Sequence, residues 1–161
     1  MFKKLTRGFA NTLSKTLLVA SLTTAALYPP SATANTDVYD AFGGKPGLTQ
    51  LMDDFMVNLI ADPRTQPFFD NDKQAFIKVM LVEQICELLG GPCKYVGRDM
   101  KSAHAHMKVN RAAFNALVEQ LQFAMDKNEI PFSAQNKLLA KLAPMYRDIE
   151  TTTGPAEPPK Q

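Results

Sequence analysis

The sequence predicts a single domain built only from α-helices. Its 161 residues, of which 45% are hydrophobic and 21% charged, have the size and composition of one globular domain. After residue 35, apolar residues recur every three or four positions, as they do on the buried face of a helix. No segment there alternates apolar and polar residues for long enough to form a strand. We therefore expect four main helices around one hydrophobic core.

Residues 1–34 are predicted to be a signal peptide. A basic leader precedes the apolar stretch Thr16–Tyr28, and Ala32-Thr33-Ala34 matches the small-residue pattern of a cleavage site. The apolar stretch is short for the roughly 30 Å hydrocarbon core of a bilayer, and two prolines follow it. These features favour cleavage before Asn35 over an uncleaved anchor. The remaining chain is expected to be exported, to a bacterial periplasm, with no membrane attachment.

The charges outside this segment nearly balance. Residues 35–161 hold 14 basic and 16 acidic side chains, so no basic surface for nucleic acid is expected. The polar, proline-rich residues 151–161 are expected to be a disordered tail. The folded domain is therefore expected to span residues 35–150.

The first two long helices lie between clear stop signals. Pro46 suits the first turn of a helix, and Asp62-Pro63 ends it because the residue before proline avoids the α region. Its apolar face comprises Leu48, Leu51, Met52, Phe55, Met56 and Leu59. Residues 68–71 are predicted to be a turn. The second face comprises Ile77, Met80, Leu81, Ile85 and Leu88, and Gly90-Gly91-Pro92 ends that helix.

Residues 94–109 are predicted to be a loop with one short helix. Asn110 is expected to cap the third long helix and Ser133 the fourth. Pro144 lies inside the fourth apolar pattern and should kink it. The third apolar face is Phe114, Leu117, Val118, Leu121 and Met125, and the fourth is Leu138, Leu139, Leu142, Met145, Tyr146 and Ile149.

The two cysteines allow two interpretations. Cys86 and Cys93 are seven residues apart, and the glycines between them let the chain turn back. An oxidising compartment would permit a disulfide, and two separate buried thiols are the alternative. No CxxC or CxxCH motif is present, so neither a thioredoxin-like site nor covalent haem attachment through cysteine is indicated.

The only two histidines are the first candidate ligands. Neutral imidazole is a common transition-metal ligand, but His104 and His106 would lie about 200° apart on a helix and cannot both face one ion. From the residues alone, an inward histidine is better explained by a hydrogen-bonded core position than by a role as a metal ligand. The apolar faces are rich in Met and Phe (8 Met, 10 Phe and no Trp), which suits either an ordinary core or a flat hydrophobic ligand.

Several separated motifs occur together in one order. They are Tyr39-Asp40-Ala41-Phe42-Gly43-Gly44, Asp54-Phe55, Ala61-Asp62, Phe68-Phe69, Leu89-Gly90-Gly91-Pro92, Tyr95-x-Gly97, Met100-Lys101-x-x-His104 and Phe114. In this order the domain resembles a group 1 truncated haemoglobin. The resemblance implies a two-over-two helical sandwich over residues 35–150 that holds non-covalent haem b and reversibly binds a diatomic gas as an oxygen-binding, carrier-type protein.

The resemblance also assigns roles to individual residues. His104 matches the proximal histidine that binds haem iron, whereas His106 has no role and is expected at the surface. The residues that match the pocket lining are Phe69, Leu89, Tyr95, Met100, Val109, Phe114 and Leu117. Lys101 matches a partner of the haem propionates, and Lys78 is a second candidate.

The gas-binding side departs from the family. Met56 stands where the family usually has tyrosine, Leu81 where glutamine is common, and Ile77 at the preceding distal position. Because bound dioxygen is polarised, the missing donor predicts fast oxygen release and ready oxidation of the iron. Gln84 is the one polar group within reach of this side, and a partly exposed amide with no role there explains it equally well.

Two alternatives to gas binding remain at this stage. Met80 lies where some family members supply a sixth iron ligand, and His104 with Met80 would suit an exported redox protein with a redox partner. The second alternative is that the domain has lost haem and serves as a binding module. Met80 and Met56 themselves would only fill space if neither binds iron. No catalytic triad, carboxylate pair or phosphate loop indicates a conventional enzyme; weak nitric oxide dioxygenase or peroxidase-like activity stays open.

Overall fold

A computed structural model describes residues 36–151. The expected signal peptide and nearly all of the expected tail lie outside the described residues. The elements are α1 (Thr36–Ala41), α2 (Gly44–Ala61), α3 (Gln66–Phe69), α4 (Gln74–Leu88), α5 (Met100–His104), α6 (Arg111–Lys127), α7 (Phe132–Leu142), the 3₁₀ turn η1 (Ala143–Met145) and α8 (Tyr146–Ile149). No strand occurs among these residues, which confirms the all-α prediction.

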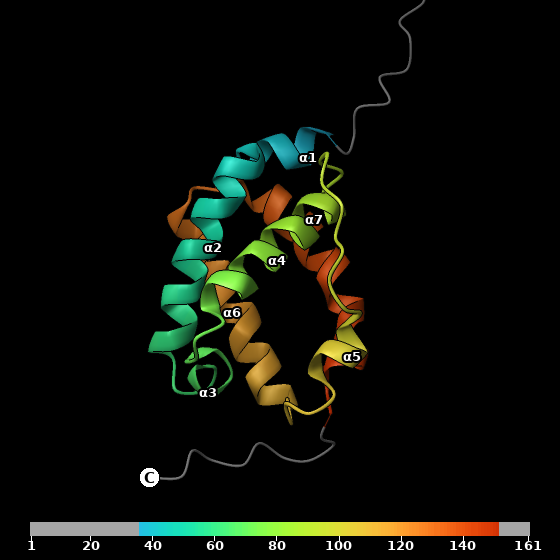
Figure 1. Ribbon diagram of the computed structural model, residues 1–161. Helices are drawn as coiled ribbons and strands as arrows, with labels where there is room; N and C mark the ends of the chain where they lie inside the picture. The colour runs from blue at the N-terminus through green and yellow to red at the C-terminus, as the bar shows by residue number, and fades with distance from the viewer. Residues whose placement is uncertain (1–35, 152–161) are drawn as a thin grey trace, which may run out of the picture. The chain divides into compact units, whose positions relative to one another are not determined.

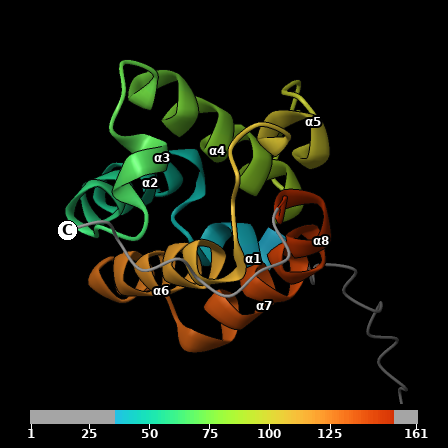
Figure 2. The same ribbon diagram turned by 90° about the horizontal axis from the view of Figure 1, so that it is seen from below.

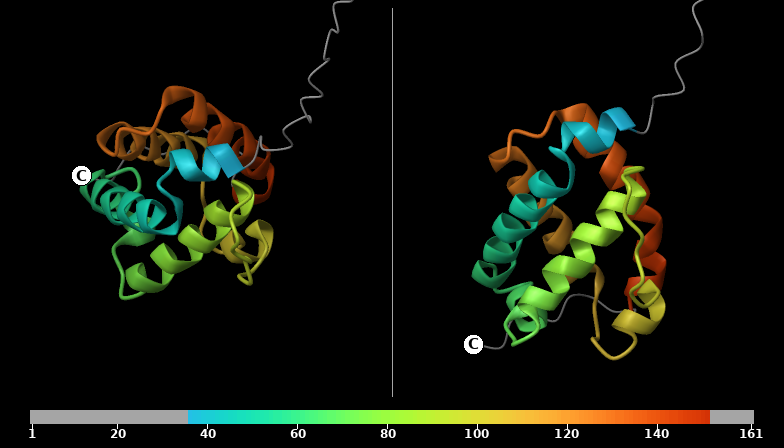
Figure 3. Two further views of the ribbon diagram at one scale, coloured as in Figure 1. Left: turned by 90° about the horizontal axis from the view of Figure 1, so that it is seen from above. Right: turned by 45° about the horizontal axis from the view of Figure 1, so that its top comes forward.

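The four long helices form two layers. Helices α2 and α4 pack against each other in one layer, and α6 and α7 form the other, as Figure 2 shows from below. Helix α2 packs across the layers on α6 (Figure 1). Viewed from above, α1 lies at one end between the two layers (Figure 3), in contact with α2 and α7. This is the expected two-over-two arrangement.

Helix α2 begins at two glycines whose backbone few other residues adopt. Gly43 and Gly44 have φ of 73° and 63°, in the left-handed region that L side chains disfavour. Three residues later, a Cβ on Gly47 would lie 2.0 Å from the carbonyl oxygen of Phe42. The glycines therefore let α1 turn sharply into α2.

The core fills the space between the layers. Its largest fully buried side chains include Phe42, Leu48, Leu51, Met52, Leu59, Leu89, Leu121, Met125 and Leu138. Most come from the predicted apolar faces. Phe42 and Leu89 are exceptions: Phe42 follows α1, which is too short to show a helical period, and Leu89 follows the end of α4.

The structure changes two of the predicted boundaries and confirms a third. The predicted turn over residues 68–71 begins within a short helix, α3. Ser133 does not cap α7, because the helix already begins at Phe132 and Pro131 takes the cap position without a side-chain bond. The kink predicted at Pro144 is confirmed, since α7 ends at Leu142 and the chain passes through η1 into α8.

The α4–α5 connection is closed by a disulfide. Cys86 near the end of α4 bonds to Cys93, with the two Cα atoms 5.7 Å apart, which decides between the two interpretations of the cysteines. Farther along, a Cβ on Gly97 would lie 2.3 Å from the hydroxyl of Tyr95, and that hydroxyl donates to the carbonyl of Arg98 at 2.8 Å. The Tyr95-x-Gly97 motif is thus a packed turn that leads into α5.

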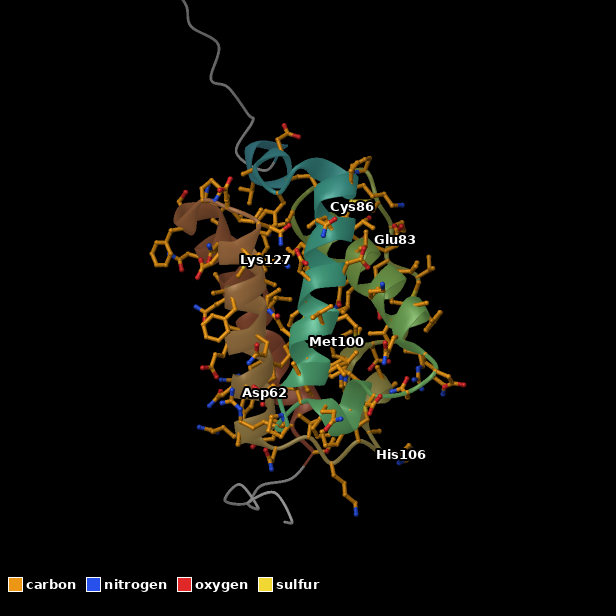
Figure 4. All side chains as sticks on the ribbon, turned by 90° about the vertical axis from the view of Figure 1, so that its left-hand side faces the viewer. Asp62, Glu83, Cys86, Met100, His106 and Lys127 are labelled. Atoms are coloured by element: carbon orange, nitrogen blue, oxygen red, sulfur yellow. A yellow bond between two sulfur atoms is a disulfide. The ribbon has the colours of Figure 1, made fainter. Side chains whose placement is uncertain are left out.

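The end of α2 is tied to α6 by a buried carboxylate. Asp62 leaves the helix with an extended backbone (ψ 118°), as Asp62-Pro63 predicts. Its carboxylate accepts from Arg64 Nη2 at 2.6 Å and from Gln120 Nε2 at 2.7 Å. Figure 4 shows Asp62 at this end of α2, beside α6. The arrangement joins the two layers at the end distant from α1.

Within residues 36–151, none of the helices combines the length and the hydropathy that a bilayer crossing requires.

Candidate functional site

His104 is the last residue of the short helix α5. The Asp99 side chain caps this helix by accepting from the backbone N–H of Ser102 at 2.9 Å. His104 Nδ1 lies 2.7 Å from the backbone carbonyl oxygen of Met100. A carbonyl oxygen only accepts hydrogen bonds, so Nδ1 carries the proton, and the lone pair is on Nε2. This is the tautomer and orientation that a metal-binding imidazole requires.

The second histidine lies elsewhere. His106 is exposed, and Figure 4 shows it at the edge of the described part, away from Met100. Within residues 36–151, no group of three or more His, Cys, Asp or Glu side chains is placed to hold a metal ion.

The other predicted site residues divide by burial. Met56, Leu89 and Val109 are buried; Phe69, Ile77, Met80, Leu81, Tyr95, Met100, Phe114 and Leu117 are half-buried; Lys101 is exposed. Leu89 belongs to the main core, and Phe69, Leu81 and Leu117 pack against that core. Most of the set is thus neither sealed in the core nor fully open to water.

Helix α4 directs its charged side chains away from α5. Lys78 pairs with Asp53 on α2, Glu83 with Lys45 (2.5 Å), and Glu87 with Lys94 (2.6 Å). The first two pairs join α4 to α2, and the third joins it to the following loop. The lysine proposed as a second propionate partner, Lys78, therefore already has a carboxylate partner in α2.

Gln84 is the polar side chain of α4 that turns toward α5. Its Nε2 donates to the Sδ atoms of Met100 at 3.5 Å and Met145 at 3.9 Å. It follows Met80 by four residues and Ile77 by seven, so all three share one helix face. The predicted gas-side residues of α4 thus share a face with an amide that touches α5 and η1.

The C-terminal helix completes this region, and the sequence reasoning gave it no role in the site. Helix α8 packs on α5, and the Tyr146 ring meets the Phe114 ring edge-to-face, with centroids 4.9 Å apart. Arg111 Nε donates to the Tyr146 hydroxyl at 2.9 Å. Partial burial, with the nearby Glu150 carboxylate, raises the pKa of Tyr146. Only the break at Pro144 hinted that the last turn would leave α7.

Two surface clefts lie apart from His104. One, of about 360 Å³, lies between α2 and α4 and includes the Lys78–Asp53 pair in its lining. The other, of about 270 Å³, lies at the end of α2 beside Gln120. His104 lines neither of them.

Comparison with known proteins identifies the family. The model of the family described as "Bacterial-like globin" matches residues 37–151. A group 1 truncated hemoglobin of Mycolicibacterium paratuberculosis is 28% identical over 114 residues, which cover 71% of this chain and 84% of that protein. One from a Nostoc species is 30% identical over 88 residues, covering 55% and 75%. The chain is a group 1 truncated globin.

Solved truncated globins share its fold. Truncated hemoglobin from Tetrahymena pyriformis in its Fe(III) form superposes with a TM-score of 0.67 at 24% identity, covering 70% of this chain and 97% of that one. The 2/2 hemoglobin from Synechococcus sp. PCC 7002, in the cyanomet state and with covalently attached heme, gives 0.65 at 20% identity, covering 70% and 96%.

The residues present fit the haem that a globin family implies. His104 offers one imidazole with its Nδ1 proton held by a carbonyl, and the other predicted site residues are mainly half-buried and apolar. A porphyrin supplies four ligands itself, so a single protein ligand on this side is sufficient. The donor set therefore suits a haem iron better than a free metal ion.

Proposed function

We propose that this globin binds haem b non-covalently through His104 and reversibly binds a diatomic gas, such as dioxygen, nitric oxide or carbon monoxide. The observation that carries the proposal is the 2.7 Å bond between His104 Nδ1 and the Met100 carbonyl, which orients the ring and keeps Nε2 available. When bound, haem supplies the ferrous iron at which such a gas binds.

The gas-binding wall is proposed to be apolar. Met56 is 4% exposed, and Ile77 and Leu81 are half-buried, so none of the three predicted distal positions offers a hydrogen-bond donor. A charge-assisted bond to polarised dioxygen is typically worth about 1.5–3 kcal/mol, and these three side chains cannot supply it. We therefore expect fast oxygen dissociation and a carrier-type rather than a strongly oxygen-retaining protein.

Non-covalent attachment and export are parts of the same proposal. Both cysteines are in the disulfide, so neither thiol is available for a thioether bond to haem. A disulfide also suits an oxidising compartment, which supports export through the signal peptide predicted in residues 1–34. Extraction of the haem by acidic organic solvent would support non-covalent binding, and pigment retained on the protein would contradict it.

The test of the haem site compares the two histidines. The protein is titrated with hemin, reduced, and followed by absorption spectroscopy before and after addition of carbon monoxide. We expect His104→Ala to lose haem retention and the exposed His106→Ala to keep it. Loss of haem in the His106 variant alone would contradict the assignment, and no Soret band in the unmodified protein would overturn the proposal.

The same spectra test the coordination of the iron. A five-coordinate ferrous spectrum that shifts at once with carbon monoxide supports gas binding. Sharp six-coordinate bands that vanish in Met80→Ala would instead favour electron transfer with His104 and Met80 as axial ligands.

A further inference from the structure

We infer that Gln84 positions the proximal histidine by holding α5 against α4, an inference that rests on the proposed function of His104. Gln84 would touch neither iron nor gas. Its amide contacts the side chain of Met100, and the backbone carbonyl of Met100 accepts the Nδ1 proton of His104. Met100 thus links the two: its side chain receives the contact from α4, and its backbone carbonyl fixes the imidazole ring.

Helix α5 needs such outside support. It has five residues, far below the roughly 12–15 at which an isolated helix becomes even marginally stable. Its local bonds include the Asp99 cap on Ser102, the bond from the Ala103 N–H to the Asp99 carbonyl, and the bond between His104 Nδ1 and the Met100 carbonyl. The position of α5, and with it that of His104, must therefore be set by contacts from other elements.

Two such supports are present. Helix α8 packs on α5 from the C-terminal part of the chain. From α4, the described side-chain hydrogen bond to α5 is that of Gln84, which also reaches Met145 in η1. The amide thus links α4, α5 and η1. A thioether sulfur is a weak hydrogen-bond acceptor, so this link lets α5 shift slightly relative to α4.

The choice of Gln84 follows from its neighbours on α4. Lys78, Glu83 and Glu87 are engaged with α2 or with the following loop, so their charges do not reach α5. Gln84 is half-buried and shares the face of Met80, among residues expected on the gas side. The inference therefore predicts that a change on α4 alters the bond between the iron and the imidazole on the other side.

The test replaces the amide and its acceptor separately and together. Gln84→Leu removes the donor at similar size, Met100→Leu removes the thioether, and the double variant completes a cycle. Gln74→Leu is the matched control, because Gln74 is also a half-buried glutamine of α4 but has no described bond to α5. Circular dichroism and urea unfolding verify that each variant folds.

The first readout is the iron–imidazole stretching band in the resonance Raman spectrum of the ferrous protein. We expect the band to shift or broaden in Gln84→Leu and in Met100→Leu, with no further change in the double variant and none in Gln74→Leu. A band unchanged in Gln84→Leu, or shifts in the two single variants that simply add, would overturn the inference.

The second readout needs no haem. Amide hydrogen exchange of residues 100–104 is measured in the haem-free protein, where loss of one net hydrogen bond should speed exchange about two- to tenfold. If the unmodified protein fails to bind hemin, the proposed function fails while this measurement still decides whether Gln84 holds α5. Equal exchange in Gln84→Leu and the unmodified protein would refute that role.

Discussion

Replacing Asp62 by asparagine removes the charge that joins the end of α2 to α6. The Asp62 side chain is 8% exposed, and its carboxylate accepts from Arg64 and from Gln120. Asparagine keeps the size and one acceptor oxygen. The substitution therefore isolates the contribution of the ionised carboxylate to the free energy of unfolding.

The size of the effect follows from the pKa of Asp62. Hydrogen bonds from Arg64, first from its side chain and then from its backbone N–H, lower this pKa from 3.8 to about 2, and Gln120 adds a further bond. Each pKa unit corresponds to about 1.4 kcal/mol, which gives an upper figure of about 2 kcal/mol. Arg64 is 48% exposed, so solvent screening reduces our expectation to about 1–2 kcal/mol at neutral pH.

The pH dependence has a definite sign. The folded state lowers the pKa of Asp62, so the stabilisation is fully present above about pH 4, the unfolded value, and is lost as pH falls toward 2. Urea unfolding at pH 7 and near pH 2 should show that Asp62→Asn costs about 1–2 kcal/mol at the higher pH and little at the lower.

The exposed Asp72→Asn serves as the control for a general charge effect. The thermal midpoint of Asp62→Asn at pH 7 should fall by about 4–8 °C, given the size of the folded domain. An equal loss of stability at both pH values would refute the reasoning, because it would show that the ionised carboxylate is not the source.

Three further predictions concern the disulfide, one helix cap and the gas-binding wall. Reduction of Cys86–Cys93, or its replacement by two serines, should lower the free energy of unfolding by about 2–3 kcal/mol in urea titrations, from the closure entropy of this short loop; unchanged unfolding in reductant would contradict it. Asn110→Ala should cost about 1 kcal/mol, because the Asn110 side chain accepts from the N–H of Ala113 at the start of α6; a loss within error of zero would show that the cap is not needed. If the proposed function holds, Leu81→Gln should slow dioxygen dissociation about tenfold or more in stopped-flow measurements by adding a donor, and an unchanged rate would place residue 81 away from the gas.

Local sequence signals determined the secondary structure well. The four long helices, the stops at Asp62-Pro63 and Gly90-Gly91, and the break at Pro144 all follow from spacing, cap chemistry and the geometry of proline. The sequence does not predict helix α1, because six residues show no period, and the predicted cap, Ser133, lies two residues after the actual cap position, Pro131. Such errors arise where neighbouring elements decide the boundary.

The order of separated motifs also identified the family, and with it His104 as the expected iron ligand. No motif, however, indicates which nitrogen of that ring carries its proton, because the acceptor is a backbone carbonyl placed by the helix. The disulfide likewise stayed one of two alternatives until the turn after α4 brought the Cα atoms within 5.7 Å. Both facts depend on backbone positions in space.

The sequence by itself determined the four long helices, the apolar face of each and which histidine matches the iron ligand. Only the tertiary structure decided what their polar atoms touch: Lys78 reaches Asp53 on α2, whereas Gln84 reaches α5 and η1. The physical reason is that helical periodicity fixes a direction around one axis, whereas a contact between two helices also depends on how their axes cross and on the loops that join them.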